Sequence, residues 1–313
     1  MEHTAAVIGC GYWGPNIARN LVDFANLKYV VDKNLELASE VAEKYEGVQA
    51  IGDVQVALDD EEVDMIAIVT PPSTHAELTE RALAANKHVF VEKPLAHSEK
   101  DAMRMLNVAL EYPYAVCCVG HTFLFVPEII KMRELIKNGL IGNIDLISVS
   151  RLNFGKYQEC GVAMDLLPHD ISIMEFLLDR ESYPLGMSTA ELGGISVVGS
   201  ATFGFKGSSA RGAAAMSWVH TDKTRKLIVT GSRGVLEFDM SMPHFVKHYV
   251  GRDVRVNRSG DLRLIEIDDH SEALASEMKY WISLINNPGS KNKISFTRGY
   301  SVVKTIEGLR DGP

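Results

Sequence analysis

A glycine-rich turn between a strand and a helix constrains the fold of this chain more than any other feature. The turn, Gly-Cys-Gly-Tyr-Trp-Gly at residues 9–14, follows an apolar run at 5–8 and precedes a helical pattern. Gly9 permits the tight turn, Gly11 lets the backbone approach a phosphate, and Gly14 lets the helix pack close to the strand. The sequence therefore predicts a pyrophosphate site for a dinucleotide at the start of this helix.

An acidic residue ends the next apolar run. Asp32 follows residues 27–31, near the spacing of about twenty residues at which such folds place a ribose-binding carboxylate. A carboxylate there accepts hydrogen bonds from both ribose hydroxyls and repels a 2′-phosphate. The next residues, Lys33 and Asn34, supply one cation and no arginine. The sequence therefore favours NAD as cofactor, with NADP as the alternative.

Strand and helix signals alternate through about the first 120 residues. Short apolar runs such as 65–69 predict strands covered on both faces, and the patterns between them predict crossover helices. The predicted strands are 4–9, 27–32, 48–51, 64–69, 88–91 and 115–119, and the predicted helices are 14–25, 35–45, 53–58, 74–85 and 98–111. This pattern predicts an α/β domain with a doubly wound parallel sheet over residues 1–120.

After about residue 120 the pattern changes to strands with fewer helices between them. Residues 213–220 alternate in character as in a sheet with unlike faces, and the glycines at 231 and 234 predict a hairpin turn. The predicted helices are 126–138, 169–178 and 271–286, and the predicted strands are 143–153, 195–205, 211–220, 225–231, 234–239, 245–250 and 262–267. We expect residues 121–313 to form an α+β domain with a large, mostly antiparallel open sheet. The uncovered face is either solvated or the interface of a homo-oligomer, a dimer or tetramer.

Composition excludes several classes of partner. The net charge of −9 argues against binding to nucleic acid or to an anionic membrane surface. No apolar run reaches the roughly 18 residues of a membrane span, and the start of the chain lacks the pattern of a signal peptide. The four cysteines at 10, 117, 118 and 160 have no metal-ligand spacing, so we expect reduced thiols and no metal site. The sequence thus predicts a cytoplasmic protein that binds neither nucleic acid nor a membrane.

Two polar clusters follow predicted parallel strands, where nucleotide-binding folds place their ligands. The first is Thr-Pro-Pro-Ser-Thr-His at residues 70–75, and the second is Glu92-Lys93-Pro94. A lysine in this place would stabilise a developing alkoxide or lower the pKa of a hydroxyl. Taken alone, a Glu–Lys pair is also typical of an exposed ion pair, and His75 of a hydrogen-bonding residue at a helix start.

A third cluster lies in the second half of the chain. Asp165 and His169 are four residues apart near a predicted loop-to-helix transition, so their side chains would lie on one side. Histidine is the usual group for taking a hydroxyl proton near neutral pH. The alternative is that Asp165 caps the helix and His169 fills a polar niche.

Together these motifs resemble the glucose-fructose oxidoreductase, inositol dehydrogenase and rhizopine catabolism (Gfo/Idh/MocA) family, in the order in which that family carries them. The resemblance covers nearly the whole chain. Segments 120–127, 151–155 and 165–172 look most like the sugar-nucleotide branch of the family. That branch includes UDP-N-acetylglucosaminuronate 3-dehydrogenases and 3-ketoreductases that act on dTDP-sugars.

The resemblance implies a Rossmann domain and a role for each motif. Lys93 would orient the sugar hydroxyl and the nicotinamide ribose, His169 would be the general acid/base, and Asp165 would position sugar hydroxyls. The implied substrate-binding residues are His121, Arg151 and Asn153. The implied cofactor-binding residues are Gly9, Gly11, Tyr12, Trp13, Gly14, Asp32, Thr70, Pro71, Pro72, His75, Glu92 and Lys93.

The implied activity is NAD-dependent oxidation of a sugar ring hydroxyl, at C3 of a UDP-N-acetylhexosaminuronate in surface-polysaccharide biosynthesis. Arg151 would pair with a carboxylate or phosphate of that substrate. Three alternatives stay open: an NADPH-dependent ketosugar reductase, a free polyol or aldose dehydrogenase, and a non-catalytic dinucleotide-binding protein. The last is disfavoured because a sensor of dinucleotide needs neither Lys93 nor the Asp165–His169 pair.

Overall fold

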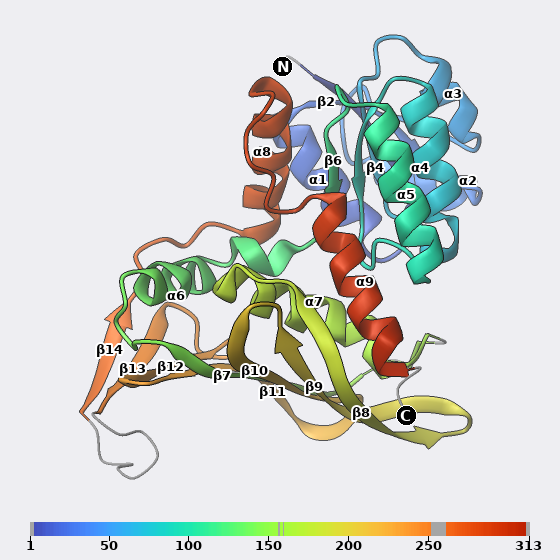
Figure 1. The fold of residues 1–313 in the computed structure, drawn as a ribbon. Helices are drawn as coiled ribbons and strands as arrows, with labels where there is room; N and C mark the ends of the chain where they lie inside the picture. Colours follow the sequence, from blue (N-terminus) through green and yellow to red (C-terminus); the bar gives the residue numbers. More distant parts are fainter. Residues whose placement is uncertain (1–2, 156, 159, 252–260, 311–313) are drawn as a thin grey trace. The chain divides into compact units, whose positions relative to one another are not determined.

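The computed structural model describes residues 3–155, 157–158, 160–251 and 261–310 (Figure 1). Contacts within the chain divide it into two units. The first contains the residues up to Thr122 together with Leu274–Val303, and the second contains Phe123–Ala273 together with the residues from Lys304 onward. Sequence patterns placed all of residues 121–313 in the second domain. The structure differs, because the returning segment Leu274–Val303 packs with the first unit.

The sheet of the first unit is six-stranded and parallel throughout, in the order β3-β2-β1-β4-β5-β6. Each predicted strand has its counterpart in the structure, which confirms the doubly wound sheet. The strands are β1 (Thr4–Ile8), β2 (Asn26–Val31), β3 (Gln49–Ile51), β4 (Met65–Ile68), β5 (His88–Val91) and β6 (Cys117–Val119). The order reverses between β1 and β4, and sheets of this kind bind ligands at that switch point.

Helices cover both faces of this sheet because its side chains alternate between two apolar cores. One core contains Ile8, Ile68 and Val91 together with side chains of the helices that connect β3 to β6. On the other face, the ring of Phe90 lies 5.5 Å from that of Trp281 on α8 (Ala273–Asn286). The other helices are α1 (Gly14–Phe24), α2 (Leu35–Ala42), α3 (Val54–Asp59), the short 3-10 turn η1 (Pro72–Thr74), α4 (His75–Ala84) and α5 (Glu99–Glu111).

The returning segment also covers the edge of β6. The amide of Val119 donates to the carbonyl of Ile294 at 2.8 Å, and Cys118 forms an antiparallel bridge with Ser295. Helix α9 (Phe296–Arg310) follows, and its Phe296 side chain enters the core of the first unit. Sequence patterns predicted α8 but not α9.

The second unit contains an eight-stranded sheet in the order β14-β13-β12-β11-β7-β10-β9-β8. Neighbouring strands are antiparallel except for β7 and β10, which confirms the mostly antiparallel sheet. The strands are β7 (Ile144–Phe154), β8 (Ser182–Leu192), β9 (Ile195–Phe205), β10 (Ser208–Ser217), β11 (Val219–Gly231), β12 (Gly234–Asp239), β13 (Phe245–Val250) and β14 (Leu262–Glu266). The predicted hairpin turn is confirmed by the pairing of Gly231 with Gly234.

Strand β8 was not predicted from the sequence. It contains Pro184 and Gly186, residues that weaken a strand signal. The structure accommodates both because β8 is an edge strand, where one row of backbone groups needs no partner in the sheet. Most of its side chains are exposed, so no apolar alternation marks it in the sequence.

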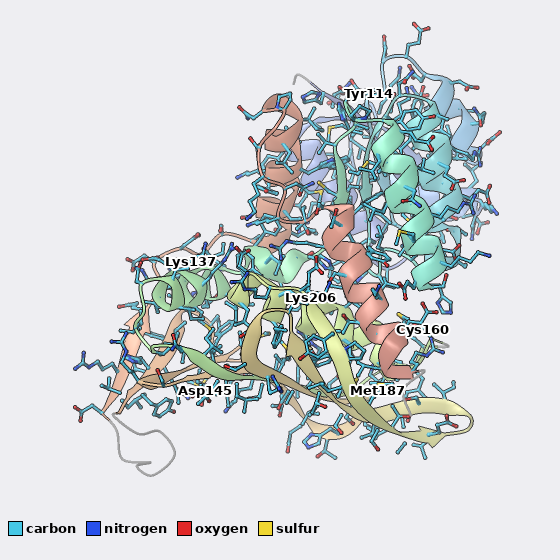
Figure 2. All side chains as sticks on the ribbon, in the orientation of Figure 1. Tyr114, Lys137, Asp145, Cys160, Met187 and Lys206 are labelled. Atoms are coloured by element: carbon cyan, nitrogen blue, oxygen red, sulfur yellow. The ribbon has the colours of Figure 1, made fainter. Side chains whose placement is uncertain are left out.

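Helices α6 (Pro127–Lys137) and α7 (Gly161–Leu178) pack on one face of this sheet. Helix α7 begins directly after Cys160, which is labelled in Figure 2, and not near residue 169 as predicted. Pro168 lies inside α7 and leaves the carbonyl of Met164 without its helical partner. Burial of nearly every α7 side chain outweighs this loss. No helix in the described part of the chain is long and apolar enough to cross a membrane.

Candidate active site

The glycine turn after β1 has the geometry that a bound pyrophosphate requires. Gly9 has a φ of +101°, and a Cβ atom on it would lie 2.6 Å from the carbonyl oxygen of Val69. A Cβ on Gly14 would lie 2.0 Å from the carbonyl oxygen of Gly9. A Cβ on Gly11 would meet nothing within 4 Å. The protein itself thus requires Gly9 and Gly14, whereas the space at Gly11 is open to a ligand.

Asp32 connects the end of β2 to this turn. One carboxylate oxygen accepts from the amide of Cys10 at 2.8 Å and the other accepts from the amide of Asn34 at 2.9 Å. Each oxygen keeps a lone pair, so the carboxylate can also accept from ribose hydroxyls. Burial, with the charge of Asp32, raises the pKa of the Cys10 thiol to about 12, so this cysteine is inert.

Two aromatic side chains project from the glycine turn. Tyr12 is 86% exposed and Trp13 is 44% exposed, and their rings meet edge to face with centroids 5.7 Å apart. Large apolar rings beside a phosphate-binding loop suit contact with a ligand. Their predicted part in cofactor binding stays a prediction.

The loop after β4 presents Thr70, Pro71 and Pro72 at least partly to solvent, but it buries His75. The Thr70 hydroxyl lies 2.7 Å from that of Thr74, which donates to the carbonyl of Pro71 at 2.8 Å. His75 was predicted to line the nucleotide cleft. It is 0% exposed, so it reaches no ligand directly, and its ring lies among backbone carbonyls.

The loop after β5 places Glu92 inside the unit and Lys93 half-buried at its margin. The Glu92 carboxylate accepts from the amide of Lys93 at 3.0 Å. Burial raises the pKa of Glu92 to about 7, although the charge of Lys93 opposes the shift. Gly120, directly after β6, leaves space for this carboxylate: a Cβ there would lie 3.2 Å from its atoms.

His121 was predicted to contact substrate, and the structure instead buries it within the first unit, where it is 1% exposed. Neither ring nitrogen has a hydrogen-bond partner among the described residues. Burial, and to a smaller extent the charges of Arg298 and Lys93, lowers the pKa of His121 to about 3. The ring is therefore neutral.

Glu277 on α8 is a further buried acid near Glu92 and His121, and the sequence analysis did not identify it as a candidate site residue. Its carboxylate accepts from the hydroxyl of Thr122 at 2.6 Å, and its side chain is 0% exposed. Burial, with the nearby charge of Glu92, raises the pKa of Glu277 well above its usual value. One signal was available: Glu277 shares the apolar stripe of its helix with Leu274 and Trp281, where a charged side chain is unusual.

Because Glu92 and Glu277 are buried acids, we expect the free energy of unfolding to fall as the pH rises. In the unfolded chain both ionise near their ordinary value of 4.5, whereas the folded unit holds their protons to higher pH. The folded state thus binds more protons above pH 4.5, and the free energy of unfolding falls by up to about 1.4 kcal/mol per pH unit for each group. The loss from Glu92 is complete near pH 7, and Glu277 adds a loss in the same direction.

Glu277→Gln should flatten this pH dependence, because the amide still accepts from Thr122 and never ionises. The measurement is the denaturation midpoint of each protein between pH 5 and 8. Glu111→Gln, at an exposed position of α5, is the matched control and should follow the wild type. A Glu277→Gln profile as steep as that of the wild type would contradict the assignment.

In the second unit, α7 presents Asp165 and His169 together. Every residue from Gly161 to Leu177 is buried except these two, which lie one turn apart on the same stripe. The ring of Phe123 packs against His169, with centroids 4.8 Å apart and planes at 70°. Both residues were predicted at a helix start. They lie inside the helix, so Asp165 is no cap.

Arg151 was predicted to pair with an anionic group of the substrate, and its charge is instead matched within the protein. The Arg151 Nε donates to Asp170 at 2.9 Å, and the two side chains are 3% and 0% exposed. The guanidinium also lies 4.5 Å over the ring of Phe123, on which His169 packs. Asn153, farther along β7, is half-buried.

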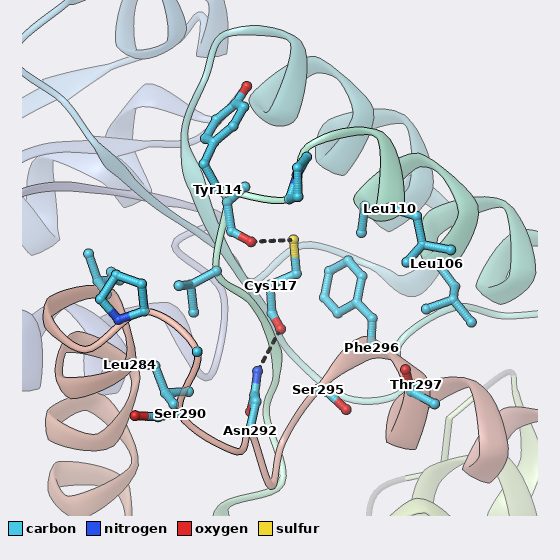
Figure 3. Close-up of a pocket in the computed structure, with 17 residues that line it drawn as sticks. Leu106, Leu110, Tyr114, Cys117, Leu284, Ser290, Asn292, Ser295, Phe296 and Thr297 are labelled. Carbon is cyan, nitrogen blue, oxygen red and sulfur yellow. Dashed lines mark hydrogen bonds between the residues drawn. The ribbon is translucent and has the colours of Figure 1, made fainter.

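A pocket in the first unit lies apart from the predicted site residues, and Figure 3 shows its lining. Its volume is about 370 Å³. It is lined by the end of α5, the start of β6 and the connection from α8 to α9, and it includes no predicted site residue. Asn292 donates to the carbonyl of Cys117 there at 3.1 Å. Burial raises the pKa of the Cys117 thiol to about 12, so this thiol is not a nucleophile.

The glycine turn gives a test of cofactor binding that separates affinity from stability. Gly14→Ala forces a methyl group against the Gly9 carbonyl and should cost about 1–3 kcal/mol of stability or more. Gly11→Ala should change stability by less than about 0.5 kcal/mol, yet weaken NAD binding at least tenfold. Calorimetric titration with NAD and thermal unfolding measure the two effects. NAD binding by Gly11→Ala at wild-type affinity would contradict the assignment.

The fold and the residues at its switch point define a dinucleotide-binding protein with an appended α+β domain. Residues 3–121 match the model of the Gfo/Idh/MocA oxidoreductase family, NAD-binding Rossmann fold, and residues 129–237 match the C-terminal domain model of the same family. The two models together cover well over half of the chain. The chain belongs to the Gfo/Idh/MocA oxidoreductase family, and its first unit carries the NAD-binding Rossmann domain.

Relatives of this chain include two enzymes that match it over part of its length. An inositol 2-dehydrogenase of Saccharopolyspora erythraea is 28% identical over 58% of this chain and 55% of its own. A UDP-N-acetylglucosamine 3-dehydrogenase of Acidithiobacillus ferrooxidans is 31% identical over 56% of this chain and 54% of its own. The matched stretch thus spans about half the length of each relative.

Solved structures match over nearly the whole fold. The same Acidithiobacillus enzyme superposes with a TM-score of 0.86 at 23% identity, covering 99% of this chain and 98% of its own. A 3-ketoreductase of Actinomadura kijaniata in complex with NADP has a TM-score of 0.85 at 18% identity, covering 100% of this chain and 98% of its own. At these identities the likeness shows the fold.

Proposed function

We propose that this chain oxidises a ring hydroxyl of a nucleotide sugar to a ketone, with NAD as the hydride acceptor. The observation that carries the proposal is the exposure pattern of α7. A helix buried along its length presents one acid and one histidine, four residues apart. This pair stands in a chain whose other unit is an NAD-binding Rossmann domain. An apolar helix presents such a pair for chemistry more readily than for packing.

His169, Lys93 and Asp165 each have a separate role in the proposed oxidation. His169 accepts the hydroxyl proton, and the Lys93 ammonium stabilises the alkoxide that develops on the same oxygen. Asp165 accepts hydrogen bonds from neighbouring hydroxyls and so orients the ring. NAD, when bound, supplies the acceptor for the hydride that leaves the sugar carbon. In the opposite direction the same groups would return a proton to a ketone.

Asp32 supports NAD over NADP. Its two oxygens each accept one backbone amide and have lone pairs left for ribose hydroxyls, whereas its charge repels a 2′-phosphate. A relative of the same fold binds NADP and is a ketoreductase. Both cofactors and both directions therefore belong in the test.

The substrate is better proposed as a UDP-N-acetylhexosamine, whose hexose ring carries no charge, than as the uronate expected from the sequence. Arg151 was the residue assigned to an anionic group of the substrate, and Asp170 already neutralises it. One partial match is to an enzyme that acts on UDP-N-acetylglucosamine. The uronate is kept as a competing substrate in the experiment.

The homo-oligomer and the cytoplasmic location stay predictions. A Cβ on Gly212 would lie 2.8 Å from the sulfur of Met174 on α7, so Ala213 and Ala215 face away from the helices. They pair in register with Ser148 and Ser150 of β7. These small side chains on the uncovered face would allow close approach of a second copy, which supports the proposed interface.

The test is the absorbance of reduced nicotinamide at about 340 nm, with protein near the concentration of the cofactor. The protein is mixed with NAD or NADP and, separately, with UDP-N-acetylglucosamine, its uronate, myo-inositol and glucose. We expect a burst with NAD and UDP-N-acetylglucosamine. A burst with inositol alone would replace the substrate class. No burst with any sugar, in a protein shown to bind NAD, would overturn the oxidation.

A further inference from the structure

His75 is buried completely, yet its ring lies among three backbone carbonyls. Its Nε2 lies 2.8 Å from the carbonyl oxygen of Thr70, and its Nδ1 lies 3.1 Å from that of Pro94 and 3.2 Å from that of Leu95. The side chain is 0% exposed. A ring so enclosed contacts no ligand, so its hydrogen bonds are its contribution.

These carbonyls belong to the two loops that carry candidate site residues. Thr70 lies in the loop after β4, and Pro94 and Leu95 directly follow Lys93 in the loop after β5. The Lys93 backbone is thus held on both sides. Its own amide donates to the Glu92 carboxylate at 3.0 Å, and the next two carbonyls face His75. All of these atoms lie in the first unit.

An apolar side chain of the same size would fill this position without the cost of burying an imidazole. A buried polar group that lacks a partner costs about 1–3 kcal/mol, so a histidine here is stable only through these carbonyls. Burial lowers the pKa of His75, whereas the bonds to Thr70, Leu95 and Pro94 raise it. With one ring proton the histidine donates to one loop, and with two it donates to both.

We propose that His75 is a positioning residue that holds the Lys93 loop to the start of α4 through the carbonyls of Pro94 and Leu95, and so sets where the Lys93 side chain stands at the ligand-binding edge. The inference deepens the proposed function, because it rests on the role given there to Lys93. It assigns His75 no contact with cofactor or substrate. Misplacement of a reacting group by about 1 Å can cost about 100-fold in rate, so such a tether matters for catalysis.

Three variants separate the two sides of the ring. In His75→Asn the amide nitrogen takes the place of Nδ1 and still donates toward Pro94 and Leu95. In His75→Gln it takes the place of Nε2 and still donates toward Thr70. His75→Phe fills the space and donates to neither. Thr79→Val is the matched control, since Thr79 is equally buried on α4 and its hydroxyl has no partner among the described residues.

The first readout is hydrogen exchange of the amides in residues 92–97, measured without cofactor or substrate. We expect at least tenfold faster exchange in His75→Gln and His75→Phe, and wild-type exchange in His75→Asn and Thr79→Val. The second readout is kinetic. His75→Gln and His75→Phe should lose about 10–100-fold in kcat, with the dissociation constant for NAD changed less than threefold. His75→Asn should keep most of the wild-type kcat.

The two readouts keep the inference separate from the proposed function. Wild-type exchange of residues 92–97 in His75→Gln and His75→Phe would overturn the positioning role, whatever the chain catalyses. Faster exchange throughout the first unit, with equal losses of stability and activity, would also overturn it in favour of a packing role. A wild-type protein that oxidises no sugar would overturn the proposed function, and the exchange pattern would still decide the role of His75.

Discussion

Lys93→Met is expected to remove nearly all turnover and to leave the fold and NAD affinity in place. Methionine keeps the length and the apolar stem of lysine but has no charge to stabilise an alkoxide. A positioned charge or proton donor of this kind contributes about 10²–10⁴-fold to the rate, and kcat should fall by that factor. The measurement is the single-turnover rate of reduced nicotinamide formation, together with NAD affinity and the thermal midpoint.

Lys44→Met is the matched control for Lys93→Met. Lys44 is exposed just beyond α2, so the same change there should leave all three measurements unchanged. Turnover of Lys93→Met within threefold of the wild type would remove Lys93 from the mechanism. A loss of NAD affinity as large as the loss of turnover would instead make it a cofactor-binding residue.

Asp170→Leu is expected to lower the free energy of unfolding of the second unit by about 3–5 kcal/mol, the usual cost of leaving one partner of a buried ion pair. Arg151 is then left charged at a position that is 3% exposed, and a guanidinium does not lose its proton in a protein. The measurement is denaturant unfolding at pH 7, followed by a signal from the second unit.

Arg151→Met should cost less than Asp170→Leu, because the carboxyl left behind can take up a proton. Burial raises the pKa of Asp170, and removal of the arginine strengthens that shift. The folded variant then binds a proton that the unfolded chain has lost, so its stability falls as pH rises above the ordinary value of 3.8.

The double variant Arg151→Met/Asp170→Leu completes the cycle. Two apolar side chains of similar volume leave no buried charge, so most of the lost stability should return. A double variant no more stable than Asp170→Leu would contradict the account of an unpaired buried charge. Turnover of the refolded double variant also shows whether the Arg151–Phe123 stack holds His169 in place.

Local pattern was sufficient to predict the first unit as far as β6. The apolar runs and the glycine turn are encoded within a few residues, and helices and strands from β1 to β6 lie where those signals placed them. The sheet of the second unit was predicted in type, but α9 and β8 were not. The signal for β8 is weak because Pro184 and Gly186 lie on an exposed edge. Helix α7 continues through Pro168 because its packing outweighs one missing hydrogen bond.

The candidate site was predictable where function depends on backbone shape and less so where it depends on a distant partner. The turn at Gly9 and Gly14 is defined by contacts within its own βα unit and the adjacent strand. Arg151 donates a hydrogen bond to Asp170, nineteen positions away, and Glu277 accepts one from Thr122, 155 positions away. No spacing in the sequence reports such pairings, so the partners of these charges came from the structure alone.

The returning segment has a consequence for how the protein is made. The free edge of β6 pairs with Ile294 and Ser295, and the Phe90 side of the sheet is covered by Trp281. A ribosome synthesises these partners only after residues 123–273, which make up most of the second unit. The nucleotide-binding domain thus waits, with an unpaired strand edge, for more than half of the chain to be translated. Chaperone binding to the nascent chain should therefore end when Phe296 has left the ribosomal tunnel.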